Sequence, residues 1–174
     1  MDTIIISDDL SGAAGMASLI GTGIPAIPFK NIDVLGKMKS SIISLDLETR
    51  NTGNAGQRLD YVKELYPEAF ILTRIDTMLR GSTSDFIEFM CKFEKLLITD
   101  TIPDFERYTY TGLTIQNERK MTIRDIVPVK LHDSIIIADS RTYSDIGKLA
   151  KRCLNENLLP VDPGIMIKLY LEMR

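Results

Sequence analysis

Aspartate follows an apolar run of this sequence at five points where a strand is expected to end. The five residues are Asp8, Asp46, Asp76, Asp139 and Asp162. Three of these segments also contain an arginine, namely Arg50, Arg80 and Arg141. A guanidinium group beside a helix N-terminus binds carboxylates and phosphates strongly, and a carboxylate can position a reacting hydroxyl. The pattern therefore predicts an anion-binding site built from strand ends.

An aspartate after a strand can instead cap the next helix, which stabilises that helix by about 1 kcal/mol. We favour this capping role for Asp139 and Asp162. One cap cannot account for both Asp8 and Asp9, because consecutive side chains at a strand end point in opposite directions. We therefore expect one of the pair to cap a helix and the other to point into a cleft.

The elements that must position these residues alternate between short β-rich runs and helical patterns. Strands are expected over residues 3–7, 24–29, 41–45, 69–75, 134–138 and 158–161. Helices are expected over residues 11–20, in a segment ending near 66, over 143–155, and after 164. Such alternation implies βαβ crossovers. We predict a Rossmann-like α/β fold of three layers, with a mostly parallel sheet and helices on both faces, as a single domain over residues 1–174.

Three further patterns give local predictions. An apolar stripe at three- and four-residue intervals predicts a strongly amphipathic helix; its members are Phe86, Phe89, Met90, Phe93, Leu96 and Leu97. Ser82, followed three residues later by Asp85, is expected to cap the start of that helix. Tyr108 and Tyr110 alternate within a strand-like run over 108–115, and we expect them to pack rather than to stack on a base.

Composition excludes several classes of protein. The chain has 174 residues, is 44% apolar, and carries 21 basic against 24 acidic residues, for a net charge of −3. It has no basic run for binding nucleic acid and no apolar stretch of the ~20 residues that cross a membrane. No secretory signal is apparent, and Cys91 and Cys153 lie outside any metal-binding or redox spacing. We expect a cytoplasmic protein with reduced thiols and no metal of its own.

Several segments resemble, in the same order, motifs of the four-carbon acid sugar kinase family, which phosphorylates threonate, erythronate and their oxidised relatives. Residues 7–14, SDDLSGAA, resemble its opening ADDLTGAAD, and residues 45–50, LDLETR, resemble its D-T-x-S-R motif. Residues 74–81, RIDTMLRG, resemble its most distinctive motif, K-I-D-S-T-L-R-G. Weaker likenesses link residues 102–107 to F-P-A-A-G-R and residues 124–129 to R-D-P-V-T-P.

The resemblance implies that the chain is the N-terminal, substrate-binding domain of such a kinase. By this match, the catalytic residues are Asp8 and Asp9, one of which would orient or deprotonate the acceptor hydroxyl. The residues that would bind the sugar acid are Ser11, Asp46, Arg50, Arg74, Asp76, Arg80, Gly81 and Arg107. Three positions depart from the family pattern, because Arg74 replaces a lysine, Met78 replaces a hydroxyl residue and Glu106 replaces a glycine.

The family's glycine-rich ATP-binding loops have no counterpart in this sequence. Residues 21–26 fit G-x-G-x-x-A, but they follow a helix and precede a strand, which is the reverse of the dinucleotide-binding arrangement. We therefore expect no cofactor in this chain, with ATP and Mg²⁺ supplied by a separately encoded ATP-binding chain. The expected ligand is a small sugar acid, and association into a homo-oligomer is left open. The alternatives are a non-catalytic sugar-acid-binding or sensor module and a decayed paralogue kept as a structural partner.

Overall fold

The computed structural model describes residues 2–174, which form two compact units. Unit 1 ends at Phe86 and unit 2 runs from Ile87 to Arg174. Helix α3 (Thr83–Met90) carries the chain from the first unit into the second. Each unit contains a parallel sheet with helices packed on it, so the predicted α/β class and parallel pairing are confirmed. The parallel strands are divided between these two sheets.

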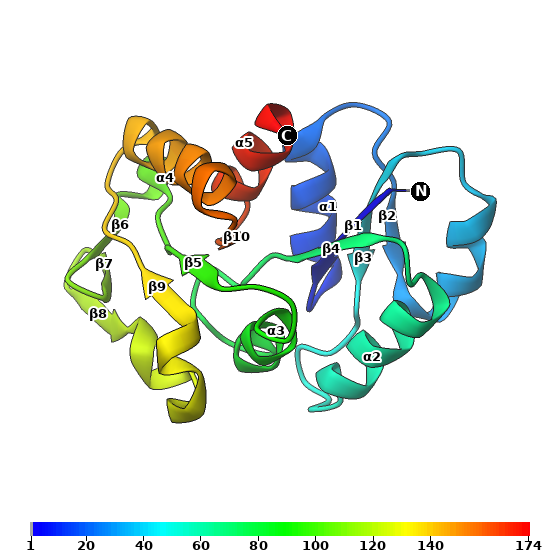
Figure 1. The fold of residues 1–174 in the computed structure, drawn as a ribbon, viewed down its shortest axis with the longest axis horizontal. Helices are drawn as coiled ribbons and strands as arrows, with labels where there is room; N and C mark the ends of the chain where they lie inside the picture. Colours follow the sequence, from blue (N-terminus) through cyan, green and yellow to red (C-terminus); the bar gives the residue numbers. More distant parts are fainter. Residues whose placement is uncertain (1) are drawn as a thin grey trace. The chain divides into compact units, whose positions relative to one another are not determined.

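Unit 1 is built on a four-stranded parallel sheet with the order β2-β3-β1-β4 (Figure 1). Its strands are β1 (Thr3–Ser7), β2 (Ala26–Pro28), β3 (Ile42–Asp46) and β4 (Phe70–Thr73). The central strands β1 and β3 are almost wholly buried, which is why they consist of nearly unbroken apolar runs. Strand β2 lies at the edge, where Pro28 removes no ladder hydrogen bond, as its prolines predict.

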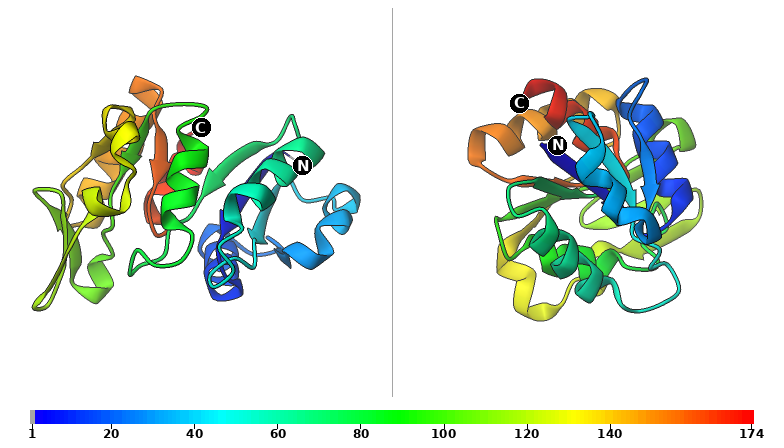
Figure 2. Two further views of the ribbon diagram at one scale, coloured as in Figure 1. Left: turned by 90° about the horizontal axis from the view of Figure 1, so that it is seen from below. Right: turned by 90° about the vertical axis from the view of Figure 1, so that its right-hand side faces the viewer.

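Helices cover both faces of this sheet (Figure 2). Helix α1 (Leu10–Ile20) follows β1 and packs on β1, β2 and β3 through Ala13, Met16 and Ala17. A 3₁₀ segment, η1 (Phe29–Lys37), follows β2, and helix α2 (Ala55–Leu65) follows β3. The connections β1–α1–β2 and β3–α2–β4 cross the sheet in opposite directions, and right-handed crossovers then place α1 and α2 on opposite faces.

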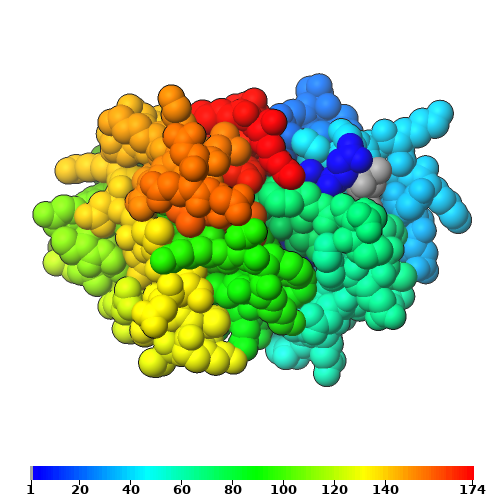
Figure 3. All heavy atoms as spheres, in the orientation of Figure 1, coloured from blue at the N-terminus to red at the C-terminus, as the bar shows by residue number. Residues whose placement is uncertain are grey.

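Unit 2 contains a three-stranded parallel sheet with the order β10-β5-β9. Its strands are β5 (Leu96–Ile98), β9 (Ile135–Ile137) and β10 (Leu159–Val161). Helices α4 (Tyr143–Glu156) and α5 (Ile165–Met173) pack against each other and against β10. Figure 3 shows their atoms, in orange and red, side by side.

The two capping predictions for unit 2 have different outcomes. The Asp162 carboxylate accepts hydrogen bonds from the amides of Met166 (2.7 Å) and Ile167 (3.1 Å), so it stabilises the start of α5 as predicted. Asp139 does not cap α4, contrary to the prediction, because Thr142 and Asp145 form a capping box there.

An antiparallel meander separates β5 from β9, where the sequence predicts one strand-like run over 108–115 and a polar turn over 116–120. Its strands are β6 (Arg107–Tyr110), β7 (Leu113–Gln116) and β8 (Arg119–Thr122), and 3₁₀ segments flank it at Pro103–Phe105, Ile123–Ile126 and Val129–Ser134. Thr111 and Gly112 both have positive φ, 49° and 78°, which is typical of a two-residue hairpin turn. The turn divides the run at residues that the apolar pattern does not distinguish.

The helix predicted from the apolar stripe is shorter than expected. Helix α3 ends at Met90, and Leu96 and Leu97 are fully buried in strand β5. Phe93 lies between the two elements and is 45% exposed. Short apolar runs of a helix and of a buried strand cannot be separated by periodicity alone, so the stripe merged two elements.

Candidate functional site

The carboxyl ends of three parallel strands in unit 1 bring the predicted site residues together. Ser7 of β1 pairs in register with Asp46 of β3, and Ile6 pairs with Thr73 of β4. The loops that follow these strands therefore start side by side. This edge is where open α/β sheets bind ligands.

One member of the adjacent pair Asp8 and Asp9 caps a helix, as predicted, whereas the other is buried against Arg50. Asp9 is the N-cap of α1 and its Oδ1 accepts a hydrogen bond from the Gly12 amide (2.7 Å). Asp8 is 1% exposed, and its carboxylate accepts two hydrogen bonds from Arg50, Nε to Oδ2 at 2.5 Å and Nη2 to Oδ1 at 2.8 Å. Asp9 is the more accessible of the two, with 31% of its side chain exposed.

Arg50 lies among three carboxylates. Besides its bidentate contact with Asp8, its Nη2 atom is 3.1 Å from Asp9 Oδ2 and 3.1 Å from Asp76 Oδ1. The hydrogen bond to Asp8 raises the pKa of Arg50 above its usual value, although burial acts in the opposite direction. Arg50 is therefore a permanent positive charge that holds three aspartates together. A ligand anion would have to compete with them for it.

Asp76 is buried and receives hydrogen bonds from its own loop. Arg80 donates through Nε (2.8 Å) and Nη2 (3.1 Å), and the amides of Met78 (2.9 Å) and Arg80 (3.2 Å) donate as well. Burial alone would raise the pKa of Asp76, but these hydrogen bonds outweigh it and lower the pKa to about 2. The Arg80 side chain remains 60% exposed, so this guanidinium is within reach of a ligand in solution.

Gly81 allows the loop after β4 to approach the Asp8–Arg50 pair. Its φ is +62°, and a Cβ atom there would overlap Asp8 Oδ2 and lie 2.8 Å from Arg50 Cδ. The next residue, Ser82, donates through its hydroxyl to Thr49 Oγ1 (2.7 Å), which joins the loops after β3 and β4. Thr49 was not among the predicted site residues. Its position between Glu48 and Arg50, in the second motif, is the sequence feature that could have indicated it.

The remaining predicted residues have diverse surroundings. Asp46 is buried, accepts a hydrogen bond from the Glu48 amide (2.7 Å), and has a pKa raised chiefly by burial. Ser11 is exposed in the first turn of α1. Arg74 reaches α1, because a Cβ atom on Gly12 would lie 2.6 Å from Arg74 Nη1.

Arg107 belongs to unit 2, whereas the other predicted site residues belong to unit 1. It is buried; its Nη2 atom donates to Gln116 Oε1 (2.5 Å), and its Nη1 atom lies 3.8 Å from Asp100 Oδ1. Arg107 therefore lies inside unit 2, where it links strands β6 and β7 through Gln116 and approaches Asp100.

The acidic cluster in unit 1 does not form a metal site. Within residues 2–174, no group of three or more His, Cys, Asp or Glu side chains is arranged to hold a metal ion. Arg50 occupies the position between the aspartates and supplies the positive charge there. Among the helices described over residues 2–174, none has the length and apolar character needed to cross a membrane.

Solved structures share this fold at low sequence identity. A Bordetella bronchiseptica protein with a domain of unknown function, DUF1537, matches with a TM-score of 0.77 at 14% identity over 97% of this chain and 56% of its own; it is described as a domain-swapped dimer with bound citrate. A Salmonella typhimurium protein described as a putative tRNA synthase matches with a TM-score of 0.73 at 12% identity, over 97% of this chain and 55% of its own.

A third match has the same domain label as the first. It is a Haemophilus influenzae DUF1537 protein, with a TM-score of 0.66 at 14% identity over 97% of this chain and 55% of its own. No protein-family model and no curated protein matches the sequence. The likeness shows a shared fold, and the chain spans about half the length of the solved chains that it matches.

Proposed function

We propose that the strand-end cluster of unit 1 binds a small sugar acid as the acceptor of a phosphoryl group. The observation that carries this proposal is that two accessible groups of opposite chemistry are anchored to the same Arg50 network. Asp9 presents a partly exposed carboxylate and Arg80 an exposed guanidinium. A polyhydroxy acid offers a hydroxyl to the first and a carboxylate to the second.

Each residue of the cluster takes a distinct part in this proposal. Asp9 orients the acceptor hydroxyl and accepts its proton, as phosphoryl transfer requires of a carboxylate near the nucleophile. Arg80 binds the acid end of the ligand through a charge-assisted hydrogen bond. Arg50, with its contacts to Asp8, Asp9 and Asp76, positions these groups rather than binding the ligand.

In this proposal, another protein chain binds the phosphoryl donor. A separately encoded chain binds ATP and Mg²⁺, and its closure over the sugar acid excludes water from the transferred group. The bound citrate of the Bordetella bronchiseptica protein supports a small hydroxy acid as the ligand class. The motif resemblance, from SDDLSGAA to RIDTMLRG, supports threonate or erythronate in particular.

Calorimetric titration with threonate, erythronate and citrate tests the binding step. We expect a four-carbon sugar acid to bind and Arg80→Ala to weaken its binding by about 10- to 150-fold, since a charge-assisted hydrogen bond contributes about 1.5–3 kcal/mol. Arg152→Ala is the matched control, because Arg152 is an exposed arginine that pairs with Glu156 on α4. If none of these acids binds, the proposed ligand class is wrong.

A turnover assay tests the division between two chains. Phosphorus NMR should detect a phosphate ester of the sugar acid when Mg-ATP and the ATP-binding chain are both present, and none with this chain alone. Turnover by this chain alone would contradict the two-chain mechanism. Sugar acid binding without turnover in the complete mixture would favour the non-catalytic binding module.

A further inference from the structure

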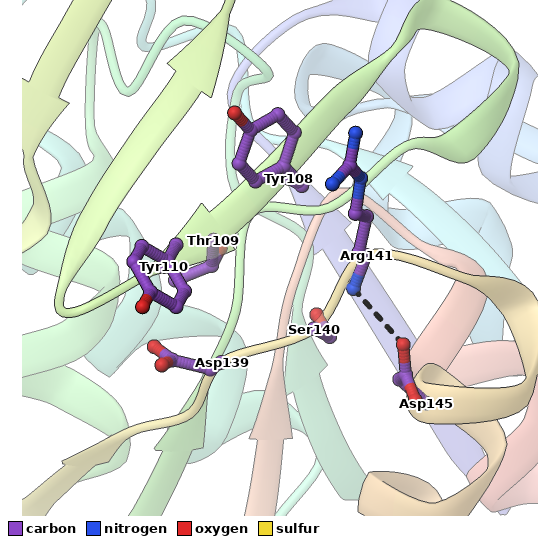
Figure 4. A pocket seen from close by; sticks show the side chains of 7 residues that line it. All are labelled: Tyr108, Thr109, Tyr110, Asp139, Ser140, Arg141 and Asp145. Carbon is purple, nitrogen blue, oxygen red and sulfur yellow. Dashed lines mark hydrogen bonds between the residues drawn. The ribbon is translucent and has the colours of Figure 1, made fainter.

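A cavity of about 500 Å³ lies within unit 2 and contains none of the residues assigned to the sugar acid (Figure 4). Its volume falls in the range typical of small-molecule sites. Strand β6 forms one wall, and the segment between β9 and α4, with the first turn of α4, forms the other. The lining residues are Tyr108, Thr109, Tyr110, Asp139, Ser140, Arg141 and Asp145.

Buried hydrogen bonds hold the two walls together. The backbones of Thr109 and Ser140 bond to each other in both directions, each at 3.0 Å. Their side-chain hydroxyls both contact Thr99 Oγ1, at 3.1 Å from Thr109 and 2.7 Å from Ser140. Asp145 is also fixed, because its carboxylate accepts a hydrogen bond from the Thr142 amide (3.0 Å) in the capping box of α4. The cavity is therefore preformed.

Two tyrosines give the cavity an aromatic wall. Tyr108 and Tyr110 occupy alternate positions of β6 and so project from the same face of the strand. The sequence predicted that Tyr110 packs, but its side chain is 58% exposed, so this prediction is wrong. An exposed ring beside a preformed cavity offers a flat surface on which a planar ligand can stack.

Two of the three charged lining groups, Arg141 and Asp139, lie at opposite ends of this wall (Figure 4). The third, Asp145, accepts a hydrogen bond from the Arg141 amide (3.2 Å). The guanidinium carbon of Arg141 is 4.8 Å from the centroid of the Tyr108 ring, and a stacked guanidinium keeps its edge N–H groups for an oxyanion. At the other end, the exposed carboxylate of Asp139 lies beside Tyr110 and can accept N–H or O–H donors. A matching ligand has an anionic group, a planar ring and hydrogen-bond donors, in that order.

We propose that this cavity binds a purine nucleoside monophosphate. The base stacks on Tyr110 with its N–H donors toward Asp139, and the phosphate binds Arg141. The ribose lies between them, along Thr109 and Ser140. The nucleotide is a bound ligand here and not a phosphoryl donor, and all its contacts belong to unit 2. The proposal is therefore independent of the proposed sugar acid site.

Calorimetric titration of the full chain with AMP and GMP tests this site. We expect saturable binding of at least one of them with a dissociation constant below about 1 mM. Tyr110→Ala should weaken binding by about 5- to 150-fold, since stacking of a base on an aromatic ring contributes about 1–3 kcal/mol. Arg141→Ala should weaken it by about 10- to 150-fold through loss of the phosphate contact. Both side chains are exposed, so neither change should disturb folding.

Matched controls separate this site from general attraction to nucleotides. Tyr61→Ala and Arg119→Ala remove an exposed tyrosine and an exposed arginine outside the cavity and should leave binding unchanged. Ribose 5-phosphate and inorganic phosphate lack the base and should bind at least tenfold more weakly. Failure of both nucleotides to bind, equal binding of ribose 5-phosphate, or an unaffected Tyr110→Ala variant would overturn the proposal. Sugar acid titrations of the same variants report on the other site separately.

Discussion

At the scale of single residues, Arg50 changes how the motif arginines of unit 1 are understood. From the sequence, Arg50 and Arg80 have the same predicted role, because each is an arginine that follows a strand. The structure distinguishes them by accessibility, because Arg50 is 19% exposed among three aspartates and Arg80 is 60% exposed beside one. No spacing rule could separate the two, since the difference arises from loops that converge only in the folded chain.

Asp76 makes the free energy of unfolding depend on pH in the acidic range. Its pKa is about 2 in the folded chain against 3.8 for an unperturbed aspartate, so its contribution is complete above about pH 4 and is lost as pH falls through about 2. We expect Asp76→Asn to lower the free energy of unfolding by about 2 kcal/mol near neutral pH. The difference from the wild type should shrink between pH 4 and pH 2. Urea denaturation at several pH values measures it.

The control for this change is Asp133→Asn, since Asp133 is exposed in the 3₁₀ segment Val129–Ser134. Its unfolding free energy should stay parallel to that of the wild type over the same pH range. If the deficit of Asp76→Asn were as large at pH 2 as at pH 7, the hydrogen bonds from Arg80 and Met78 would not be the source of the stabilisation.

At the scale of elements, the loop between β4 and α3 contributes four of the predicted site residues, Arg74, Asp76, Arg80 and Gly81, and Gly81 is its most crowded position. Gly81→Ala should impair sugar acid binding by at least tenfold, because the added methyl would displace Asp8 and Arg50. It should also destabilise the fold by more than about 1 kcal/mol through its positive φ. Calorimetric titration and denaturant unfolding measure the two effects.

Gly112→Ala separates conformational strain from displacement of the site. Gly112 also has a positive φ, +78°, but a Cβ atom there meets nothing within 4 Å. We expect this variant to lose similar backbone stability while sugar acid binding stays intact. Equal loss of binding in both variants would show that displacement of Asp8 and Arg50 by the added methyl is not the cause of the loss.

The sequence predicted elements well where one pattern applied throughout. Strand β1, with its run from Thr3 to Ser7, has the predicted bounds, and helix α2 ends beside Tyr66 as expected. Errors occurred where two elements share a pattern, as between α3 and β5, or where a turn divides a run, as at Thr111 and Gly112. The exposure of Tyr110 was also missed, since alternation gives its face but not what covers that face.

At the scale of the whole molecule, the two proposed ligand sites belong to different units. Hydrogen exchange with mass spectrometry should show that a sugar acid slows exchange in segments 46–50 and 74–82 of unit 1. A purine nucleotide should slow exchange in segments 107–110 and 139–145 of unit 2, since binding protects the amides of the loops that it orders. If both ligands protected the same segments, the assignment of two sites would be wrong.

The meander of unit 2 has a consequence for how the protein behaves at high concentration. Strand β8 is one of the two outer strands of its sheet, and an outer strand offers unpaired backbone groups to other chains. Arg119 and Lys120 are exposed on this strand, so a second copy approaching in β-pairing would bring like charges together. The same two side chains that make β8 hard to recognise from its apolar pattern thus protect its edge from aggregation.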